Sequence, residues 1–249
     1  MKVSIITVCY NSEETIKATI ESIINQNYNS IEHIIVDGKS TDRTLKIVKQ
    51  YEDKISKIIS ESDCGLYDAI NKGISIATGD IVGLLHSDDI LATTNTISKI
   101  VEVFKASNCE AIYGDLQYVD RNDSNKIFRN WIADSYKHGM FLKGWMPPHP
   151  TLYLRRELFN KLGNYNTDFK FAADYELMLR YIHKHQIELS YIPETLVKMR
   201  TGGKSNSSFV NRIKANLEDR KAWRVNDIKA NFLTPYMKPL SKLKQFYKK

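Results

Sequence analysis

The segment VSIITVC, at residues 3–9, is a nearly continuous run of β-branched and apolar side chains. Such a run is typical of a strand in a parallel sheet, where both faces of each strand are covered. Ser12 follows at a position where it can cap a helix, with Glu13 and Glu14 in the first turn and isoleucines at helical spacing. The beginning of the chain therefore predicts a strand that leads directly into a helix.

The same alternation repeats along the next ninety residues. Strand-like apolar runs and helical periodicity alternate at residues 33–36, 45–51, 57–60, 66–77, 81–85 and 93–106. Four strand–helix units in succession imply right-handed crossovers and a mostly parallel sheet that is covered by helices on both faces. We therefore predict an α/β fold.

The pattern changes after residue 113. Residues 116–119 and 126–130 flank a polar turn and predict an antiparallel hairpin. The other expected elements are a short strand at 151–154, a short helix at 156–162, a longer helix at 174–185, and strands at 187–192 and 196–199. The sequence thus predicts two halves, residues 1–113 and 114–208.

Composition limits the class of protein. The chain has 249 residues, of which 42% are hydrophobic, and a mean hydropathy of −0.39, as in an ordinary globular domain. It has no apolar run near the about 18 residues that a membrane span requires, and it begins with no pattern of a secretory signal. Its three cysteines are widely spaced, which argues against a disulfide framework or structural zinc and favours a reducing cytoplasm.

The formal net charge of +7 is concentrated near the end of the chain. Residues 209–249 carry 11 basic and 3 acidic side chains, whereas residues 1–208 carry 25 basic and 26 acidic ones. Apolar side chains at helical spacing among the final lysines predict a basic amphipathic helix that binds an anionic membrane surface. The alternative is a solvated tail that packs partly on the body. Nucleic acid is disfavoured, because the body is not basic and no nucleic-acid-binding motif is present.

Polar side chains follow each of the first four predicted strands. They are Tyr10 and Asn11, Asp37, Glu61 and Asp63, and Asp88 and Asp89. Ligands of open α/β sheets bind at this edge, and a cluster of carboxylates repels itself unless a cation joins it. A single aspartate after a strand is more often a turn residue, but the set favours a divalent metal that also contacts phosphate. The glycine loops of dinucleotide-binding and P-loop proteins are absent from the sequence.

Several motifs occur in an order that resembles a known family. VSIITVCYN, VDGKSTD, GLYDAINKG, GD and SDD occupy residues 3–11, 36–42, 65–73, 79–80 and 87–89. Together they resemble the nucleotide-sugar-binding half of a family 2 glycosyltransferase with the GT-A fold. HPT, FAADYELMLR and MRTGG, at residues 149–151, 171–180 and 199–203, resemble the acceptor-binding half of that family.

The resemblance covers residues 3–208 and implies the fold. It predicts a GT-A domain over residues 1–208, with a nucleotide-sugar-binding half at 1–113, an acceptor-binding half at 114–208 and a helical tail at 209–249. The GT-A fold is a Rossmann-like, mostly parallel central sheet flanked by helices, here with a small antiparallel element.

The resemblance also implies an activity. A bacterial enzyme of this kind transfers a sugar, with inversion, from a nucleotide-diphosphate donor to a saccharide or lipid-linked saccharide acceptor in surface-polysaccharide biosynthesis. Such an enzyme works in the cytoplasm, and here the tail is expected to bind the inner face of the cytoplasmic membrane. One alternative is a sugar nucleotidyltransferase, although that class needs a glycine-rich basic loop after the first strand. The other is a non-catalytic nucleotide-sugar-binding module.

The resemblance assigns the metal site to Asp88 and Asp89. One of these carboxylates is expected to bind Mn²⁺ or Mg²⁺ across the diphosphate and the other to touch the ribose, with Asp88 favoured for the metal. Many relatives carry an acid where this chain has His86. His86 is therefore either a further metal ligand or an ordinary loop or buried histidine.

Asp174 matches the family's general base, although a carboxylate at a helix N-terminus is also favoured by the helix dipole alone. Glu176, two residues further, is expected to be structural. His149 is expected to contact the acceptor, with a solvated loop histidine as the alternative. Donor-binding residues implied by the resemblance are Tyr10, Asp37, Tyr67, Asp68, Lys72, Asp89 and Arg200. Arg200 precedes Gly202, Gly203 and Lys204, which form either a loop that closes over the diphosphate or a plain glycine turn.

Overall fold

The structure is a computed structural model that describes residues 1–202 and 209–229. Gly203 and Lys204 of the expected loop lie outside the described residues, as does the segment 230–249 that carries the predicted membrane-binding helix. The membrane prediction therefore stays a prediction. No helix within residues 1–202 and 209–229 is long and apolar enough to cross a membrane.

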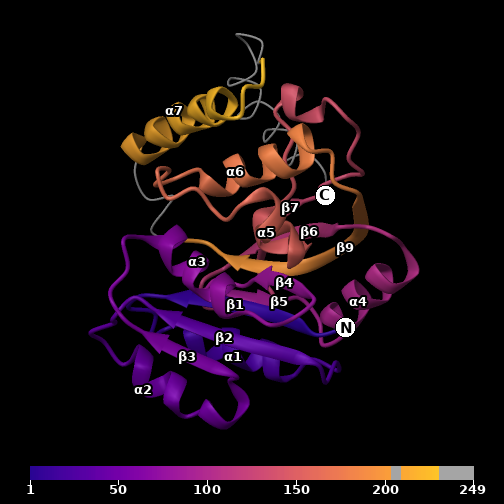
Figure 1. The fold of residues 1–249 in the computed structure, drawn as a ribbon. Helices are drawn as coiled ribbons and strands as arrows, with labels where there is room; N and C mark the ends of the chain where they lie inside the picture. Colours follow the sequence, from indigo (N-terminus) through magenta and orange to yellow (C-terminus); the bar gives the residue numbers. More distant parts are fainter. Residues whose placement is uncertain (203–208, 230–249) are drawn as a thin grey trace.

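The first half of the chain is the predicted parallel sheet (Figure 1). Strands β1 (Val3–Cys9), β2 (Ile31–Asp37), β3 (Lys57–Ser60) and β4 (Ile81–Leu84) lie in the order β3-β2-β1-β4 and pair in parallel. Every residue of β1 is buried, as its composition predicts. The register places Cys9 beside Asp37 and Asp37 beside Ser60, so the carboxyl ends of three strands meet at one edge.

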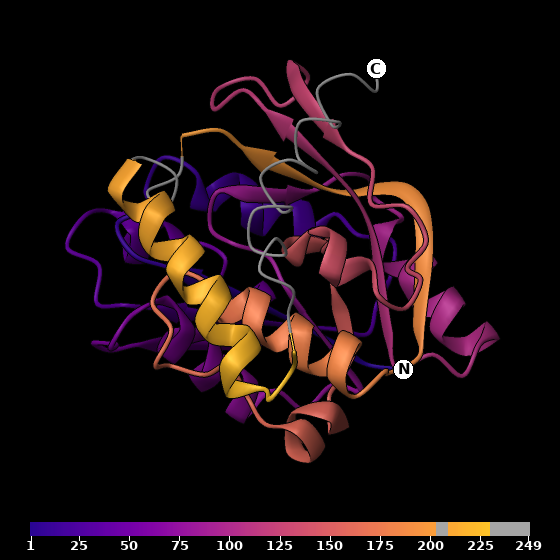
Figure 2. The same cartoon turned by 90° about the horizontal axis from the view of Figure 1, so that it is seen from above.

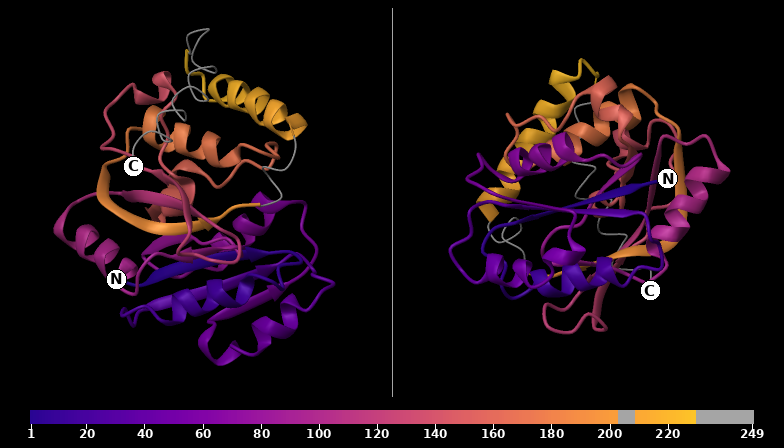
Figure 3. Two further views of the ribbon diagram at one scale, coloured as in Figure 1. Left: turned by 180° about the vertical axis from the view of Figure 1, so that it is seen from behind. Right: turned by 60° about the horizontal axis from the view of Figure 1, so that its bottom comes forward.

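Helices cover both faces of this sheet. Their bounds are α1 (Ile16–Ile24), α2 (Thr44–Lys49), the short η1 (Glu52–Lys54), α3 (Leu66–Ile76) and α4 (Thr96–Ala106). The views from behind and from below show α1 and α2 on one face, where Ile16, Ile20 and Val48 pack on Ile35 (Figure 3). α3 packs on β1 and β2 from the other side, within the main core.

Helix α1 begins later than the sequence predicts. Thr15 is its N-cap residue, and the backbone carbonyl oxygen of Ser12 accepts from the amides of Thr15 and Ile16 at 3.1 and 3.0 Å. Glu13 and Glu14 therefore precede the helix, where they pair with arginines of other segments instead of the helix dipole. The prediction that Ser12 caps the helix was wrong, because the segment that connects β1 to α1 extends as far as Thr15.

The second half extends the same sheet with strands of mixed direction. β6 (Ala111–Val119) and β7 (Ile127–Trp131) form the predicted hairpin, and β8 (Tyr153–Arg155) pairs antiparallel with β4 and β6. The full order is β3-β2-β1-β4-β8-β6-β9-β5, and β7 pairs with the later part of β6, outside this order. The α/β class and the mostly parallel sheet with an antiparallel element are confirmed.

Two expected strands are a single one, β9 (Leu189–Arg200), which runs parallel to β6. Its register skips Pro193 and Glu194, because Gly114 pairs with Ile192 while Asp115 pairs with Thr195. A bulge of this kind interrupts the side-chain alternation, so the sequence reads as two strands. β9 also pairs with β5 (Asp89–Leu91), a short strand that the sequence did not predict.

The remaining helices lie over the second half. They are η2 (Met140–Lys143), η3 (His149–Thr151), α5 (Glu157–Leu162), α6 (Ala173–Met178) with its π-helical continuation η4 (Leu179–Lys184), and α7 (Phe209–Val225). Seen from above, α7 lies beside α6 (Figure 2). Trp223 on α7 donates from its indole nitrogen to the hydroxyl of Tyr175 at 3.0 Å. This first part of the predicted tail thus packs on the body.

Candidate functional site

The loops that follow the parallel strands are tied to one another at the carboxyl edge of the sheet. The hydroxyls of Ser12, after β1, and Ser87, after β4, lie 2.9 Å apart. The backbone amide of Asn11 donates to the hydroxyl of Ser40 at 2.9 Å, and Asn11 accepts in return from the amide of Thr41. The polar side chains predicted for this edge therefore lie in one connected region.

Asp37 is fully buried beneath the turn that follows β2. One carboxylate oxygen accepts from the Ser40 amide at 3.0 Å and from the Ser60 hydroxyl at 2.7 Å, and the other accepts from the Ser40 hydroxyl. These bonds hold a turn in which Lys39 has a φ of +63°. Asp37 thus shapes the loop at the carboxyl end of β2.

Gly38 has no side chain, and this leaves space in the turn for the neighbouring loops. A Cβ at this position would collide with the carboxylate of Asp63 and come within 3.6 Å of the Tyr10 ring. Tyr10 itself is 53% exposed. Tyr10, Gly38 and Asp63 bring the loops after β1, β2 and β3 together.

Asp68 and Lys72 brace the loop between β3 and α3. The ammonium of Lys72 lies 2.9 Å from Glu61 and 3.4 Å from Asp68, and donates to the carbonyl oxygen of Ser62 at 2.8 Å. Asp68 accepts from the amide of Cys64 at 3.0 Å, a bond that lowers the pKa of its carboxyl group. The hydrogen bond to Glu61 raises the pKa of Lys72, which keeps its positive charge beside this loop.

Asp88 and Asp89 have different environments. Asp88 is partly exposed, whereas Asp89 is fully buried and, among the described residues, neither of its carboxylate oxygens has a hydrogen-bond partner. Burial first, and then the charge of Asp88, raise the pKa of Asp89 well above its ordinary value, while the charge of Arg200 and the backbone amide of Arg200 oppose this shift. A buried carboxyl group without partners is costly, which is typical of a group that meets a ligand.

Arg200, at the end of β9, lies beside these acids. Its guanidinium donates to the carbonyl oxygen of Asp88 at 3.1 Å, and burial lowers its pKa while Asp89 and Asp88 raise it. Arg121, which was not predicted, also acts on Arg200 by its charge and pairs with Glu14 at 2.7 Å. The predicted metal acids and the predicted phosphate-binding arginine are thus in one place, with a second arginine nearby.

The donor set fits a divalent cation that shares its ligands with a substrate. Within residues 1–202 and 209–229 there is no group of three histidine, cysteine or acidic side chains arranged to hold a metal. Mg²⁺ and similar ions are commonly held by one or two carboxylates together with substrate phosphates and water. Asp88, with the unpartnered oxygens of Asp89 behind it, offers such a partial site.

Asp174 is the centre of a second group of side chains, the Asp174 cluster, which comprises Asp174, Tyr67, Tyr165, His149 and His86. Asp174 is the second residue of α6 and accepts a hydrogen bond from the hydroxyl of Tyr67 at 3.2 Å. The hydroxyl of Tyr165 lies 2.8 Å from Nε2 of His149, and the rings of His149 and His86 are 6.0 Å apart. The structure thereby joins residues that the sequence assigned separately to base, donor and acceptor.

Burial lowers the pKa of both histidines of the Asp174 cluster. Burial lowers the pKa of His149 to about 4, although the charge of Asp174 opposes the shift. Burial also lowers the pKa of His86, against the charges of Asp88 and Asp174. The alternative of a solvated loop histidine at 149 is wrong, because His149 is only 8% exposed and is bonded to Tyr165.

Two residues that the sequence did not single out hold the segments around Asp174. Glu218 of α7 accepts from the amides of Lys170, Phe171 and Ala172 at 2.9, 2.8 and 2.9 Å, and Ala172 is the N-cap residue of α6. Glu218 is one acid in a mainly basic segment, and no local pattern indicates its role.

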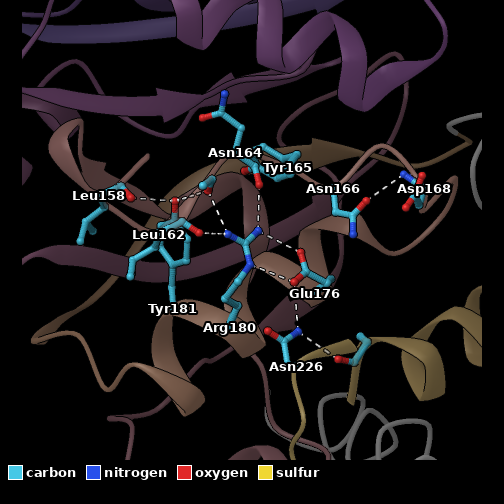
Figure 4. Close-up of polar contacts among 12 residues, drawn as sticks. Leu158, Leu162, Asn164, Tyr165, Asn166, Asp168, Glu176, Arg180, Tyr181 and Asn226 are labelled. Carbon is cyan, nitrogen blue, oxygen red and sulfur yellow. Dashed lines mark hydrogen bonds and ion pairs between the residues drawn. The ribbon is translucent and has the colours of Figure 1, made fainter. Parts of the chain in front are cut away.

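Arg180 is the second of these residues (Figure 4). It donates to the carbonyl oxygens of Leu162, Gly163 and Asn164, the last two at 2.9 and 2.8 Å. It also forms a two-point ion pair with Glu176 at 2.9 and 3.0 Å. Glu176 is buried and has the structural role expected of it.

Comparisons with known proteins agree with this geometry. A sequence model of glycosyl transferase family 2 matches residues 4–172. The chain is 33% identical over 181 residues to an uncharacterized glycosyltransferase of Mycobacterium tuberculosis, across 72% of this chain and 68% of that protein. It is 28% identical over 209 residues to a PGL/p-HBAD biosynthesis glycosyltransferase of Mycobacterium bovis, across 82% and 79% of the two chains.

Solved structures share the fold. Staphylococcus aureus TarS 1–349 in complex with UDP-GlcNAc superposes with a TM-score of 0.70 at 19% identity, over 95% of this chain and 69% of that one. The mannosyltransferase PcManGT from Pyrobaculum calidifontis, in complex with GDP-Man and Mn²⁺, gives a TM-score of 0.68 at 20% identity, over 97% and 73%. At these identities the likeness concerns the fold.

Proposed function

The chain belongs to glycosyltransferase family 2, and from this premise we propose that it transfers a sugar, with inversion, from a nucleotide-diphosphate donor to a hydroxyl group of a saccharide or lipid-linked saccharide. The observation that carries the proposal is the position of His86. It precedes Asp88 by two residues, and its ring lies 6.0 Å from the ring of His149 in the Asp174 cluster, so the loop of the predicted metal acid lies beside the predicted base. A role in surface-polysaccharide biosynthesis is part of the proposal.

On the donor side, the diphosphate would bind beside Arg200 and the neighbouring acids. Arginine makes strong charge-assisted hydrogen bonds to phosphate oxygens, and Arg200 already lies next to Asp88. Asp88, together with Asp89, would hold Mn²⁺ or Mg²⁺, which when bound stabilises negative charge on the departing diphosphate. The Mn²⁺ and GDP-Man in the PcManGT structure, and the UDP-GlcNAc in that of TarS, support a metal and a nucleotide-sugar donor.

The nucleotide would lie over the loops at the carboxyl ends of β1 to β3. Tyr10 offers an exposed ring there, and Asp37 fixes the turn that would face the base or ribose. Asp68 and Lys72 brace the neighbouring loop at the entrance of α3. In this proposal these residues bind the donor largely by holding its loops in place.

On the acceptor side, Asp174 would be the general base. One oxygen accepts from Tyr67, and the other would take the proton of the acceptor hydroxyl as that hydroxyl attacks the sugar. His149, neutral and bonded to Tyr165, would line the place of the acceptor.

The proposal is tested with Asp88→Asn and Asp174→Asn, assayed with UDP-, GDP- and dTDP-sugars in the presence of Mn²⁺. Binding of the correct donor raises the melting temperature of the native protein and of Asp174→Asn, because a ligand that binds the folded state stabilises it. We expect Asp88→Asn to lose the Mn²⁺-dependent part of this shift, and both variants to lose transfer.

The products separate the alternatives. Transfer releases a nucleoside diphosphate from the nucleotide-sugar. A sugar nucleotidyltransferase instead releases pyrophosphate when it is given a nucleoside triphosphate and a sugar 1-phosphate, and a non-catalytic module releases neither product. His185→Gln is the matched control, since His185 is an exposed histidine of the same half. Wild-type turnover in both aspartate variants would show that the proposed mechanism is wrong.

A further inference from the structure

We propose that Tyr67 is a positioning residue for the base, whose hydroxyl donates to Asp174 and fixes which carboxylate oxygen receives the acceptor proton. The inference rests on the proposed role of Asp174 and assigns to Tyr67 a task different from the donor contact that the sequence resemblance implies. It is a hydrogen bond between two halves of the chain, since the partners are 107 residues apart.

The Tyr67 hydroxyl is suited to remain a donor. Tyr67 is the second residue of α3 and is 7% exposed. Burial, followed by the charge of Asp174, raises the pKa of Tyr67 well above its ordinary value. The phenol therefore keeps its proton throughout the pH range in which a carboxylate base works.

The Tyr67 ring is itself held in place. It stacks on the ring of Tyr165 with centroids 5.8 Å apart and an interplanar angle of 14°. Asn71, one turn further along α3, donates to the carbonyl oxygen of Tyr165 at 2.8 Å and accepts from its amide at 3.1 Å. Tyr67 and Asn71 thus both contact Tyr165 from the same face of α3.

The other partners are fixed from the second half. Arg180 binds the carbonyl oxygens of residues 162–164, immediately before Tyr165, as Figure 4 shows. Glu218 binds the amides of residues 170–172, immediately before the helix that carries Asp174. A donor and an acceptor that are each anchored in this way lose little entropy when they meet, which favours a fixed carboxylate.

Several groups face Asp174, and Tyr67 is the one that donates the described hydrogen bond to its carboxylate. His86 follows β4 and His149 lies in η3, and in both the burial that lowers the pKa is opposed by the charge of Asp174. Tyr165 also faces Asp174, but its hydroxyl lies at Nε2 of His149. Among the described residues, the hydrogen bond that the structure shows on the Asp174 carboxylate comes from Tyr67.

The test is Tyr67→Phe, which removes the hydroxyl and keeps the ring on Tyr165. We expect kcat to fall about 10- to 100-fold, the loss typical of a hydrogen bond to a charged group, with the donor KM changed by less than about twofold.

Tyr153→Phe is the matched control. Tyr153 is also a fully buried tyrosine, and among the described residues its hydroxyl has no hydrogen-bond partner. This variant is expected to keep the kcat and the donor KM of the wild type. A merely structural role for Tyr67 predicts a lower melting temperature with kcat unchanged, and that result would overturn the proposal.

A second measurement does not depend on activity. The melting temperatures of Tyr67→Phe, Asp174→Asn and the double variant form a cycle, and the two changes should be non-additive because the residues are in contact. Additive shifts would contradict the hydrogen bond. A rise in the donor KM alone would mean that Tyr67 contacts the donor and does not position the base. Transfer by Asp174→Asn at the wild-type rate refutes the proposed function, whereas an inactive Asp174→Asn with an unaffected Tyr67→Phe refutes this inference alone.

Discussion

The guanidinium of Arg200 donates to the backbone carbonyl oxygen of Asp88 across 3.1 Å. This bond joins the end of β9 to the loop after β4, and it places a positive charge beside Asp88 and the buried Asp89. In a protein interior such a charge limits the repulsion between two neighbouring acids. Arg200 therefore supports the acids before any substrate binds and remains close enough to contact a diphosphate that binds there.

Arg200→Gln is expected to lower kcat/KM for the donor about 10- to 100-fold, the loss of roughly one or two hydrogen bonds to a charged group. Steady-state kinetics at saturating Mn²⁺ measure this effect. Lys99→Gln, which removes a cation paired with Glu194 away from the acids, should leave the kinetics unchanged. Equal losses in the two variants would mean that Arg200 acts only through net charge.

Glu218→Gln is expected to destabilise the protein and slow the reaction together. Glu218 accepts three backbone amides at the start of α6, and the neutral variant keeps only one acceptor oxygen. We expect the free energy of unfolding to fall by about 1–3 kcal/mol, measured by urea denaturation, and kcat to fall severalfold because Asp174 is less well placed.

The control for Glu218 is Glu157→Gln on the surface of α5. Glu157 forms an exposed pair with Lys161, so its removal should change stability by less than about 0.5 kcal/mol. Should Glu218→Gln behave like this control, the bonds to residues 170–172 contribute little.

The first half of the fold was predictable because its signals are local. β1 to β4 are short apolar runs, each followed by a helix with its own periodicity, so neighbours in the sequence decide the structure. β5 was missed because it has three residues and exists only by pairing with β9, more than a hundred residues later. The start of α1 was misplaced because the Ser12 hydroxyl lies against Ser87 of a distant loop instead of capping the helix, which begins after Thr15.

The candidate site was predictable to the extent that motifs mark it. Asp88, Asp174 and Arg200 were assigned to the site from short motifs. The structure joins Arg200 to Asp88 by a hydrogen bond and places the ring of His86, two residues before Asp88, 6.0 Å from His149 of the Asp174 cluster. The contacts between them were not predictable. Tyr67 reaches Asp174, and Glu218 reaches the start of α6, only after α3 and α7 have docked. Such contacts depend on tertiary packing, which no local pattern encodes.

Arg180→Lys is expected to be strongly destabilising despite the conserved charge. Arg180 uses its planar group to bind Glu176 at two points and three loop carbonyl oxygens, which one ammonium group cannot replace (Figure 4). Glu176 is buried, so weakening its pair should cost up to about 3–5 kcal/mol of unfolding free energy. Asn226→Ala, which removes a bond of 3.0 Å to Glu176, should cost less, and the reverse order would contradict this account.

His33 gives the stability a defined dependence on pH. It lies fully buried in β2, with Nε2 3.0 Å from the hydroxyl of Thr7, and burial lowers its pKa from 6.5 to about 3. In the unfolded chain the same side chain takes up a proton near pH 6.5, whereas in the folded protein it stays neutral. The unfolded state therefore binds more protons between these values, and stability is lost as the pH falls through them.

His33→Gln removes this titration and keeps a polar side chain near Thr7. We expect its free energy of unfolding to decrease less steeply with falling pH than that of the wild type, by about 1.4 kcal/mol per pH unit below pH 6. Urea denaturation between pH 5 and 7.5 measures the difference. The buried His149 affects the stability of both proteins equally, so its contribution cancels. His185→Gln, at an exposed histidine, should run parallel to the wild type. Parallel curves for His33→Gln would mean that water or a partner reaches the imidazole in the folded state.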